Sequence, residues 1–153
     1  MEIKLNPIAI IRNSRIQPMD DFWGEIISEI ELFNRIPTEE ACNNISDFSH
    51  LEIIYYFSQV ETKDIVYNGK PRGNSNYPQV GIFGQRKKDR PNPIGLCTVE
   101  LIEHTDRIIK VKYLDAINGT PVLDIKPVFK EFQPKGEIKQ PNWVGDLMRN
   151  YWE

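Results

Sequence analysis

Residues 51–57 read Leu51-Glu52-Ile53-Ile54-Tyr55-Tyr56-Phe57 and are the clearest strand signal in the sequence. It is rich in β-branched and aromatic side chains, which is typical of a β-strand. The run is also apolar almost throughout, and a continuous apolar run favours a strand that is covered on both faces. We therefore expect this segment to form a strand at the centre of a β-barrel.

Shorter elements are predicted before this segment. Residues 3–12 are interpreted as one strand, and residues 25–33 as a half-exposed strand in which isoleucine and leucine alternate with glutamate. Between Pro37 and Phe48 the sequence favours a helix-like turn, with Thr38 as its cap. This turn is too short to be a major element of the fold.

Loop and strand signals alternate after the central segment. Residues 68–78 hold many turn formers and no periodicity, which indicates a long surface loop. Asn118-Gly119 is the strongest short hairpin signal, and we expect it to form a type I′ turn that joins the last two strands. The strands predicted in this part of the chain are 80–83, 94–102, 107–115 and 122–126.

Apolar side chains recur at helical spacing near the C-terminus, which predicts an amphipathic helix over residues 141–152. They are Trp143, Val144, Leu147, Met148, Tyr151 and Trp152. Several short strands with few helices between them argue for a barrel rather than a doubly wound sheet. The predicted fold is mainly β: residues 1–153 form a single-domain β-barrel of about seven short strands with a short C-terminal amphipathic helix.

Length, composition and charge exclude several classes of function. The chain has 153 residues, of which 40% are apolar and 27% charged, as expected for one globular core. Its 19 basic and 22 acidic residues give a net charge of −3, so an overall positive field for nucleic acid is absent. The longest apolar runs, such as residues 8–11, are too short for a membrane span or a signal-peptide core. We expect a soluble, cytoplasmic protein that does not insert into a membrane.

Metal and nucleotide chemistry are not indicated by the sequence. Cys42 and Cys97 form no Cys-x-x-Cys pattern, and the only histidines are His50 and His104, so we expect neither a metal site nor a disulfide framework. Cys97 shares the parity of apolar neighbours and is interpreted as a core residue rather than a nucleophile. Because phosphate-binding glycine loops and the Gly-x-Ser-x-Gly motif are both missing, nucleotide hydrolysis and serine-hydrolase chemistry are disfavoured.

A basic loop interrupts this acidic sequence. Residues 70–90 hold six basic residues and one acidic residue, a local charge of +5, while the remainder of the chain carries −8. Pro91 and Pro93 restrict the residues before them and stiffen the loop. The charge favours a local anionic partner such as RNA, with Tyr77 and Phe83 nearby to stack on bases. A solvated charged loop without a partner explains the same composition equally well.

Asp115 is the second candidate for a chemical role. It shares the parity of Ile109 and Val111, so it is expected to point to the apolar face at the end of its strand. A carboxylate in that place is unfavourable unless it is hydrogen-bonded or functional. From the pattern alone, capping of the Asn118-Gly119 turn explains Asp115 better than catalysis does.

Three motifs together resemble a known family. They are Arg90-Pro91-Asn92-Pro93-Ile94-Gly95-Leu96, Phe48-Ser49-His50-Leu51, and Leu114-Asp115-Ala116-Ile117-Asn118-Gly119-Thr120-Pro121-Val122-Leu123-Asp124-Ile125-Lys126-Pro127. In their order and spacing, over about residues 3–130, the chain resembles the TsaA-like (TrmO-type) family. The resemblance implies a β-barrel methyltransferase that uses S-adenosylmethionine and works as a homodimer, with the cofactor near the subunit interface. Characterised members methylate the exocyclic nitrogen of threonylcarbamoyladenosine beside the tRNA anticodon, so the resemblance implies tRNA as the partner.

The resemblance also implies which residues form the site. The implied cofactor contacts are Asp20, Asp21, Phe22, Ser58, Gln59, Arg86, Leu96, Lys112, Tyr113, Leu114 and Asp115. The family usually has His-Gln where this chain has Ser58-Gln59, and Ala-Thr-Arg where it has Gly84-Gln85-Arg86. The expected substrate contacts, for phosphate or carboxylate groups, are Lys87, Lys88, Arg90 and Asn92.

The implied chemistry suits these residues. Methyl transfer from a sulfonium is an in-line displacement that depends mainly on holding the methyl carbon and the nitrogen about 3 Å apart. A ureido nitrogen becomes a better nucleophile when it loses its proton, and Asp115 is the candidate acceptor of that proton. Two other functions remain open: a non-catalytic barrel that binds RNA or a small molecule, and a methyltransferase that acts on another small substrate.

Overall fold

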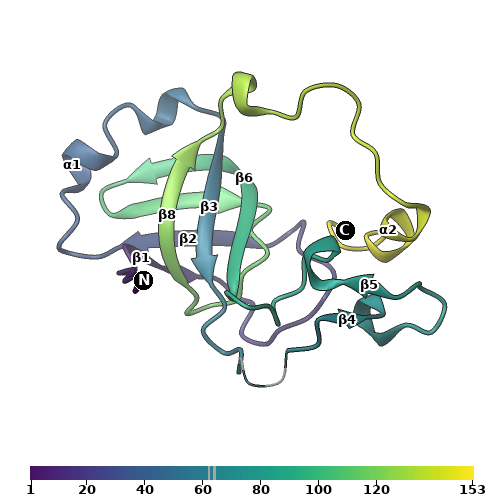
Figure 1. Cartoon of the computed structure of the whole chain (residues 1–153). Helices are drawn as coiled ribbons and strands as arrows, with labels where there is room; N and C mark the ends of the chain where they lie inside the picture. The colour runs from purple at the N-terminus through teal and green to yellow at the C-terminus, as the bar shows by residue number, and fades with distance from the viewer. Residues whose placement is uncertain (62, 64) are drawn as a thin grey trace.

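Six strands close into an antiparallel barrel in the computed structural model, which describes residues 1–61, 63 and 65–153 (Figure 1). The order around the barrel is β1-β2-β7-β6-β3-β8, and β8 pairs with β1 to close it. These strands are β1 (Ala9–Arg12), β2 (Ile27–Leu32), β3 (His50–Tyr56), β6 (Ile94–Thr105), β7 (Ile108–Lys112) and β8 (Pro121–Pro127). The predicted mainly β barrel is confirmed.

Strand β3 lies between β6 and β8, as expected for a central strand, but only one of its faces is covered. Leu51, Ile53 and Tyr55 point into the barrel and are at most 1% exposed. On the other face Ile54 is half-buried and Tyr56 is 38% exposed. The prediction of cover on both faces is wrong, because the outer face of a closed antiparallel barrel can face solvent.

The interior is packed with side chains from all six barrel strands. Tyr55 is the largest fully buried side chain, and its ring lies over Gly95, the residue opposite it in β6. Cys97 is buried in the same core, as its parity predicted. The core side chains include Ala9, Ile11, Ile30, Leu32, Leu51, Ile53, Tyr55, Cys97, Val99, Ile109, Val111, Leu114, Ala116 and Val122.

Strand β1 is shorter than predicted. It begins at Ala9, and residues 3–8 form no strand. Ile3 and Leu5, whose alternation suggested the longer strand, are 75% and 57% exposed. Pro7 lacks the backbone N–H that a paired strand would use, which is consistent with this later start.

The predicted helix-like turn is present, but Thr38 does not cap it. Helix α1 (Thr38–Ala41) is followed by the 3-10 turn η1 (Ile45–Asp47). The carbonyl of Pro37 accepts a hydrogen bond from the N–H of Ala41, so Pro37 is the N-cap and Thr38 is the first helical residue.

The Asn118-Gly119 dipeptide does not form a hairpin between β7 and β8. β7 pairs with β2 and β6, whereas β8 pairs with β1 and β3. The dipeptide instead binds the first strand region: Asn118 N donates to Arg15 O at 2.7 Å and Gly119 N donates to Ile11 O at 2.8 Å. The connection from β7 to β8, with Leu114 and Ala116 buried, crosses the end of the barrel. The preference of Asn-Gly for a tight turn does not predict this path.

A small hairpin stands beside the barrel. It pairs β4 (Asn68–Gly69) with β5 (Val80–Gly81). The 3-10 turn η3 (Pro71–Gly73) lies in the loop between these strands, and the 3-10 turn η4 (Ile82–Gly84) follows β5. The predicted loop therefore contains a short strand and a turn, and the predicted strand at 80–83 ends after two residues.

The chain then runs from β8 through η5 (Lys130–Phe132) to helix α2 (Asn142–Leu147), which lies beside the β4–β5 hairpin and away from α1 (Figure 1). The predicted helix over 141–152 is thus only six residues long. After Leu147 the chain continues in turns with i+3 hydrogen bonds, such as Tyr151 N to Met148 O at 3.1 Å, and the carbonyls of Asn150 and Tyr151 accept hydrogen bonds from Phe22 N and Trp23 N. Among residues 1–61, 63 and 65–153, no helix has the length and apolar character needed to cross a membrane.

Candidate functional site

Asp115 accepts hydrogen bonds from two tyrosines that come from distant parts of the chain. The hydroxyl of Tyr55, in β3, donates to Asp115 Oδ1 at 2.6 Å. The hydroxyl of Tyr151, near the C-terminus, donates to Asp115 Oδ2 at 2.6 Å. Asp115 itself lies in the connection between β7 and β8 and is half-buried. The alternative that Asp115 caps the Asn118-Gly119 turn is therefore wrong, because its carboxylate binds these phenols.

The residues just before Asp115 are held in an unusual backbone conformation. Tyr113 has φ of 66°, in the region that non-glycine residues rarely occupy. Its carbonyl accepts a hydrogen bond from Cys97 Sγ at 2.9 Å, and its ring meets the edge of Trp152 and the ammonium of Lys112. Contacts from Cys97 and Trp152 thus fix the segment that the resemblance implies as a cofactor contact.

Burial and Asp115 together keep the neighbouring groups protonated. Burial raises the pKa of Tyr55 and of Tyr151 above the usual value, and the charge of Asp115 and its hydrogen bond add to the shift. Burial likewise raises the pKa of the Cys97 thiol, and Asp115 adds to it. At neutral pH all three groups therefore act as hydrogen-bond donors.

The loop at residues 20–22 is clamped by two arginines. Arg72 binds both carboxylate oxygens of Asp21, at 2.9 and 3.1 Å. Arg15 donates to the carbonyls of Asp21 and Phe22 and lies 4.4 Å from the centre of the Trp23 ring. Phe22 has φ of 65° and leaves 49% of its surface exposed. The clamp holds an exposed aromatic ring in a fixed place.

Arg86 lies against the start of β6. Its Nη2 donates to the carbonyl of Leu96 at 2.6 Å, and its charge is close enough to affect Cys97. Leu96 is 46% exposed on the outer face of the barrel. Arg86 and Leu96, both implied as cofactor contacts, are therefore neighbours.

The contacts link most of the implied cofactor residues into one region. Cys97 connects Leu96 to Tyr113, and the C-terminal residues 150–152 connect Tyr113 and Asp115 to the loop at 20–22. Ser58 and Gln59 lie in the exposed turn after β3. That turn is tied to the beginning of β6 by a hydrogen bond from Phe57 N to Pro93 O, rather than by a contact to Asp115.

The basic loop is partly occupied by contacts within the chain. Lys88 pairs with Asp89 at 3.4 Å, Lys87 reaches Val66 O at 3.4 Å, and Arg90 donates to Gln85 O at 3.1 Å. Asn92 is exposed. The four predicted substrate residues are thus neighbours along one loop, and the two lysines are held only by long contacts.

The two aromatic residues expected to stack on bases differ in the structure. Tyr77 donates to Asp146 Oδ2 at 2.6 Å and packs against Trp143, so it fastens α2 instead of facing a partner. Phe83 is 84% exposed. Only Phe83 keeps the position that the sequence interpretation assumed.

The residues that the sequence interpretation missed are Tyr55, Tyr151, Arg15 and Arg72. A signal existed for Tyr55, since a phenol on the inner face of a strand needs a polar partner and Asp115 was placed on an inner face. No comparable signal marked Tyr151, whose helical spacing suggested only a packing role.

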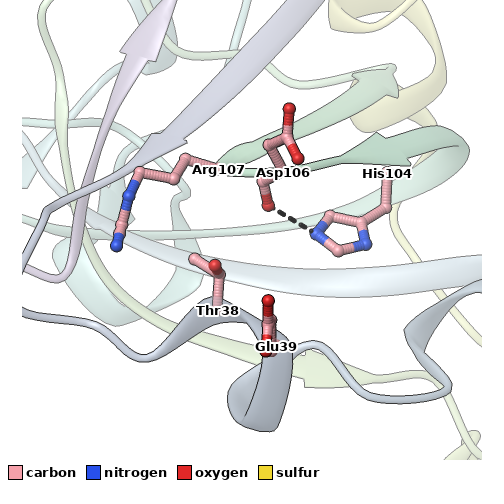
Figure 2. A pocket seen from close by; sticks show the side chains of 5 residues that line it. All are labelled: Thr38, Glu39, His104, Asp106 and Arg107. Carbon is pink, nitrogen blue, oxygen red and sulfur yellow. Dashed lines mark hydrogen bonds between the residues drawn. The ribbon is translucent and has the colours of Figure 1, made fainter.

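A polar hollow lies elsewhere, at the far end of the β6–β7 hairpin. Figure 2 shows Thr38 and Glu39 of α1 facing the hairpin residues His104, Asp106 and Arg107. The Arg107 guanidinium is engaged by the carbonyls of Phe33, Asn34 and Ile36. The arginine of this hollow therefore supports the preceding loop, and the hollow is separate from the site around Asp115.

Comparison with known proteins gives consistent matches. A model of the family described as tRNA-methyltransferase O N-terminal domain matches residues 14–133. A protein of Methanothermobacter thermautotrophicus named "Probable S-adenosyl-L-methionine-binding protein" is 34% identical over 140 residues, which cover 89% of this chain and 97% of that protein. The tRNA (adenine(37)-N6)-methyltransferase of Escherichia coli is 37% identical over 103 residues, covering 65% of this chain and 44% of that enzyme.

The fold also matches a solved structure. The crystal structure of TrmO from Pseudomonas aeruginosa superposes with a TM-score of 0.72 at 23% identity, covering 91% of this chain and 62% of that one. This likeness supports the barrel fold. The chain spans less than two thirds of that structure and less than half of the Escherichia coli enzyme.

Proposed function

The chain belongs to the family of the tRNA-methyltransferase O N-terminal domain, and from this premise we propose that it is an S-adenosylmethionine-dependent methyltransferase. Its proposed substrate is the exocyclic nitrogen of threonylcarbamoyladenosine beside the anticodon of tRNA. The observation that carries the proposal is a continuous series of contacts, through Cys97 and residues 150–151, that joins the separate segments at residues 20–22, 86, 96 and 112–115.

The side chains in this region fit the chemistry of S-adenosylmethionine. Phe22 and Leu96 offer exposed apolar surface, which suits an adenine ring. The Asp20 side chain is 72% exposed and can accept hydrogen bonds from a ribose hydroxyl or an ammonium group. The guanidinium of Arg86 suits a carboxylate. When bound, the cofactor supplies an electrophilic methyl group on its sulfonium.

The chain's own residues then have positioning and proton-accepting roles. Each oxygen of Asp115 accepts one tyrosine hydroxyl, and a carboxylate oxygen can accept a second hydrogen bond. Asp115 thus keeps capacity to receive the proton of a ureido nitrogen. Positioning supplies most of the acceleration in such a transfer, which needs no metal ion.

The basic loop is the proposed contact for the RNA. Lys87, Lys88, Arg90 and Asn92 follow Arg86 within six residues of the same loop, so phosphate groups bound there would lie close to the proposed cofactor residue Arg86. A net positive charge is concentrated in this part of an otherwise acidic chain, which favours a polyanion that docks at one place. A tRNA substrate also assigns the protein to the cytoplasm.

A homodimer is the proposed assembly. Four apolar side chains form a patch on the outer faces of β3 and β6. In this outer apolar patch Ile54 lies opposite Leu96, and Tyr56 lies opposite Ile94. Tyr56, Ile94 and Leu96 are each at least 38% exposed, and Leu96 adjoins Arg86. A second copy on this patch would cover apolar surface beside the cofactor residues. Sedimentation at micromolar concentration should give a dimer, Ile94→Lys should give a monomer, and a monomeric wild-type chain would contradict the assembly.

The experiment that tests the function is calorimetric titration of the chain with S-adenosylmethionine, followed by mass analysis of tRNA nucleosides from a strain that lacks the gene. We expect saturable cofactor binding and loss of the methyl group from threonylcarbamoyladenosine. Cofactor binding with unchanged tRNA would point to another small substrate. If the chain does not bind S-adenosylmethionine, the methyltransferase proposal is wrong and the alternative is a non-catalytic barrel that binds RNA or a small molecule.

A further inference from the structure

The C-terminal segment, residues 142–153, reaches the site from outside the barrel. Its backbone pairs with the loop that follows Asp21: Phe22 N donates to Asn150 O at 3.0 Å and Trp23 N donates to Tyr151 O at 2.9 Å. Gly24 accommodates the segment closely, because an added Cβ there would stand 1.9 Å from Trp152 O. The segment is thus docked by its backbone, independently of any one side-chain hydroxyl.

Two tyrosine hydroxyls form hydrogen bonds between this segment and other parts of the chain. Tyr77 donates to Asp146 in the segment, and Tyr151 in the segment donates to Asp115, both at 2.6 Å. Only the second bond ends on a residue of the candidate site. Tyr151 also packs its ring against Trp152, which in turn meets Tyr113.

Without Tyr151 the Asp115 carboxylate would have only Tyr55 as a side-chain donor in the described residues. Asp115 lies in the connection between β7 and β8 and not in a strand, so its orientation is not fixed by sheet pairing. Two donors on different oxygens set the plane of a carboxylate, whereas one donor leaves it free to rotate.

We propose that Tyr151 is a positioning residue: its hydroxyl holds the Asp115 carboxylate in the orientation that serves the cofactor site. This assignment rests on the proposed function. It makes the C-terminal segment part of the site, although no residue of that segment was implied by the family motifs.

The test compares two matched variants by calorimetric titration with S-adenosylmethionine. Tyr151→Phe removes the hydroxyl on Asp115 and should raise the dissociation constant by roughly tenfold, as expected for loss of a hydrogen bond to a charged group. Tyr77→Phe removes a hydroxyl with the same bond length from the same segment and should leave the constant within about twofold. An equal loss in both variants would show that Tyr151 only anchors the segment, and an unchanged constant in Tyr151→Phe would overturn the proposal directly.

A double-mutant cycle tests whether Tyr151 acts through Asp115. Asp115→Asn should weaken binding by itself, and Tyr151→Phe added to it should cause little further loss. Fully additive losses would contradict the positioning role. Thermal unfolding of each variant reports separately on stability. Failure of the wild-type chain to bind S-adenosylmethionine would overturn the proposed function, and this assignment with it, whereas wild-type binding with a normal Tyr151→Phe overturns the assignment alone.

Discussion

The ring of Tyr55 lies over Gly95 so closely that no side chain fits between them. A Cβ added to Gly95 would stand 2.2 Å from Cε2 and 2.3 Å from Cζ of that ring. The two residues face each other across the β3–β6 ladder. Because the same ring carries the hydroxyl that binds Asp115, the glycine of the Arg-Pro-Asn-Pro-Ile-Gly motif supports the site through packing.

Gly95→Ala should therefore damage both stability and the site. The added methyl group must push the Tyr55 ring aside, and overpacking of this kind costs about 1–3 kcal/mol. Urea unfolding measures the loss of stability, and calorimetric titration with S-adenosylmethionine measures the effect on binding. Gly145→Ala in α2 is the matched control, since nothing lies within 4 Å of its added Cβ and alanine favours a helix. Equal stability of the two variants would contradict the packing account.

Stability should fall at high pH because of two tyrosines. Burial, then the charge of Asp115, raises the pKa of Tyr55 and of Tyr151 in the folded chain. An unfolded tyrosine has a pKa of about 10, so the stabilisation by the neutral hydroxyl is fully present below about pH 10. Above that value each of the two tyrosines lowers the free energy of unfolding by up to about 1.4 kcal/mol per pH unit, until the pH reaches its folded-state pKa.

Urea unfolding between about pH 9 and about pH 12 checks this prediction. The free energy of unfolding of the wild-type chain should decline above about pH 10, and Tyr151→Phe should make that decline shallower. If the free energy of unfolding of Tyr151→Phe declines with pH as steeply as that of the wild type, burial and Asp115 do not raise the pKa of Tyr151.

Arg86→Ala should weaken binding of S-adenosylmethionine. If its guanidinium holds the cofactor, the loss is about 1.5–3 kcal/mol, the usual range for charged hydrogen bonds. Arg12→Ala serves as the control, because Arg12 pairs with Glu31 on the exposed surface and has no place in the site. An unchanged dissociation constant for Arg86→Ala in calorimetry would remove Arg86 from the cofactor site.

The double variant Lys87→Ala/Lys88→Ala tests the RNA contact of the basic loop. Binding of tRNA should weaken, and the slope of log affinity against log salt should flatten by roughly 0.7–0.9 per lost phosphate contact. Cofactor affinity should change little. The control is Lys4→Ala/Lys130→Ala, which removes the same charge from exposed positions outside the loop. An unaltered salt slope together with lost cofactor binding would instead assign the loop to the cofactor pocket.

The barrel was predictable because its signals are local. β-branched runs and alternating parity identified the strands, and the parity of Cys97 identified its burial. The pairing of those strands was not local. The Asn118-Gly119 signal was interpreted as a hairpin, but residues 113–117 cross the barrel end, and Asn118 and Gly119 bind the carbonyls of Arg15 and Ile11, which are distant in sequence.

The site was predictable in its motif residues but not in its supports. Asp115 was found from its parity and from the family motif, whereas its two hydroxyl donors come from residues 60 and 36 positions away. The Tyr151 spacing suggested a longer helix, because a sequence pattern does not show that the residues after Leu147 form turns and pair their backbone with residues 22–23. Arg72 was counted as part of a basic loop, yet it is neutralised by Asp21.

Methyl transfer itself is measured with isotopically labelled S-adenosylmethionine and tRNA that carries threonylcarbamoyladenosine, followed by mass analysis of the nucleosides. We expect the wild-type chain to place the label on threonylcarbamoyladenosine, and Asp115→Asn to transfer much less. A wild-type chain that binds both cofactor and tRNA but transfers no label to this nucleoside would contradict the proposed function.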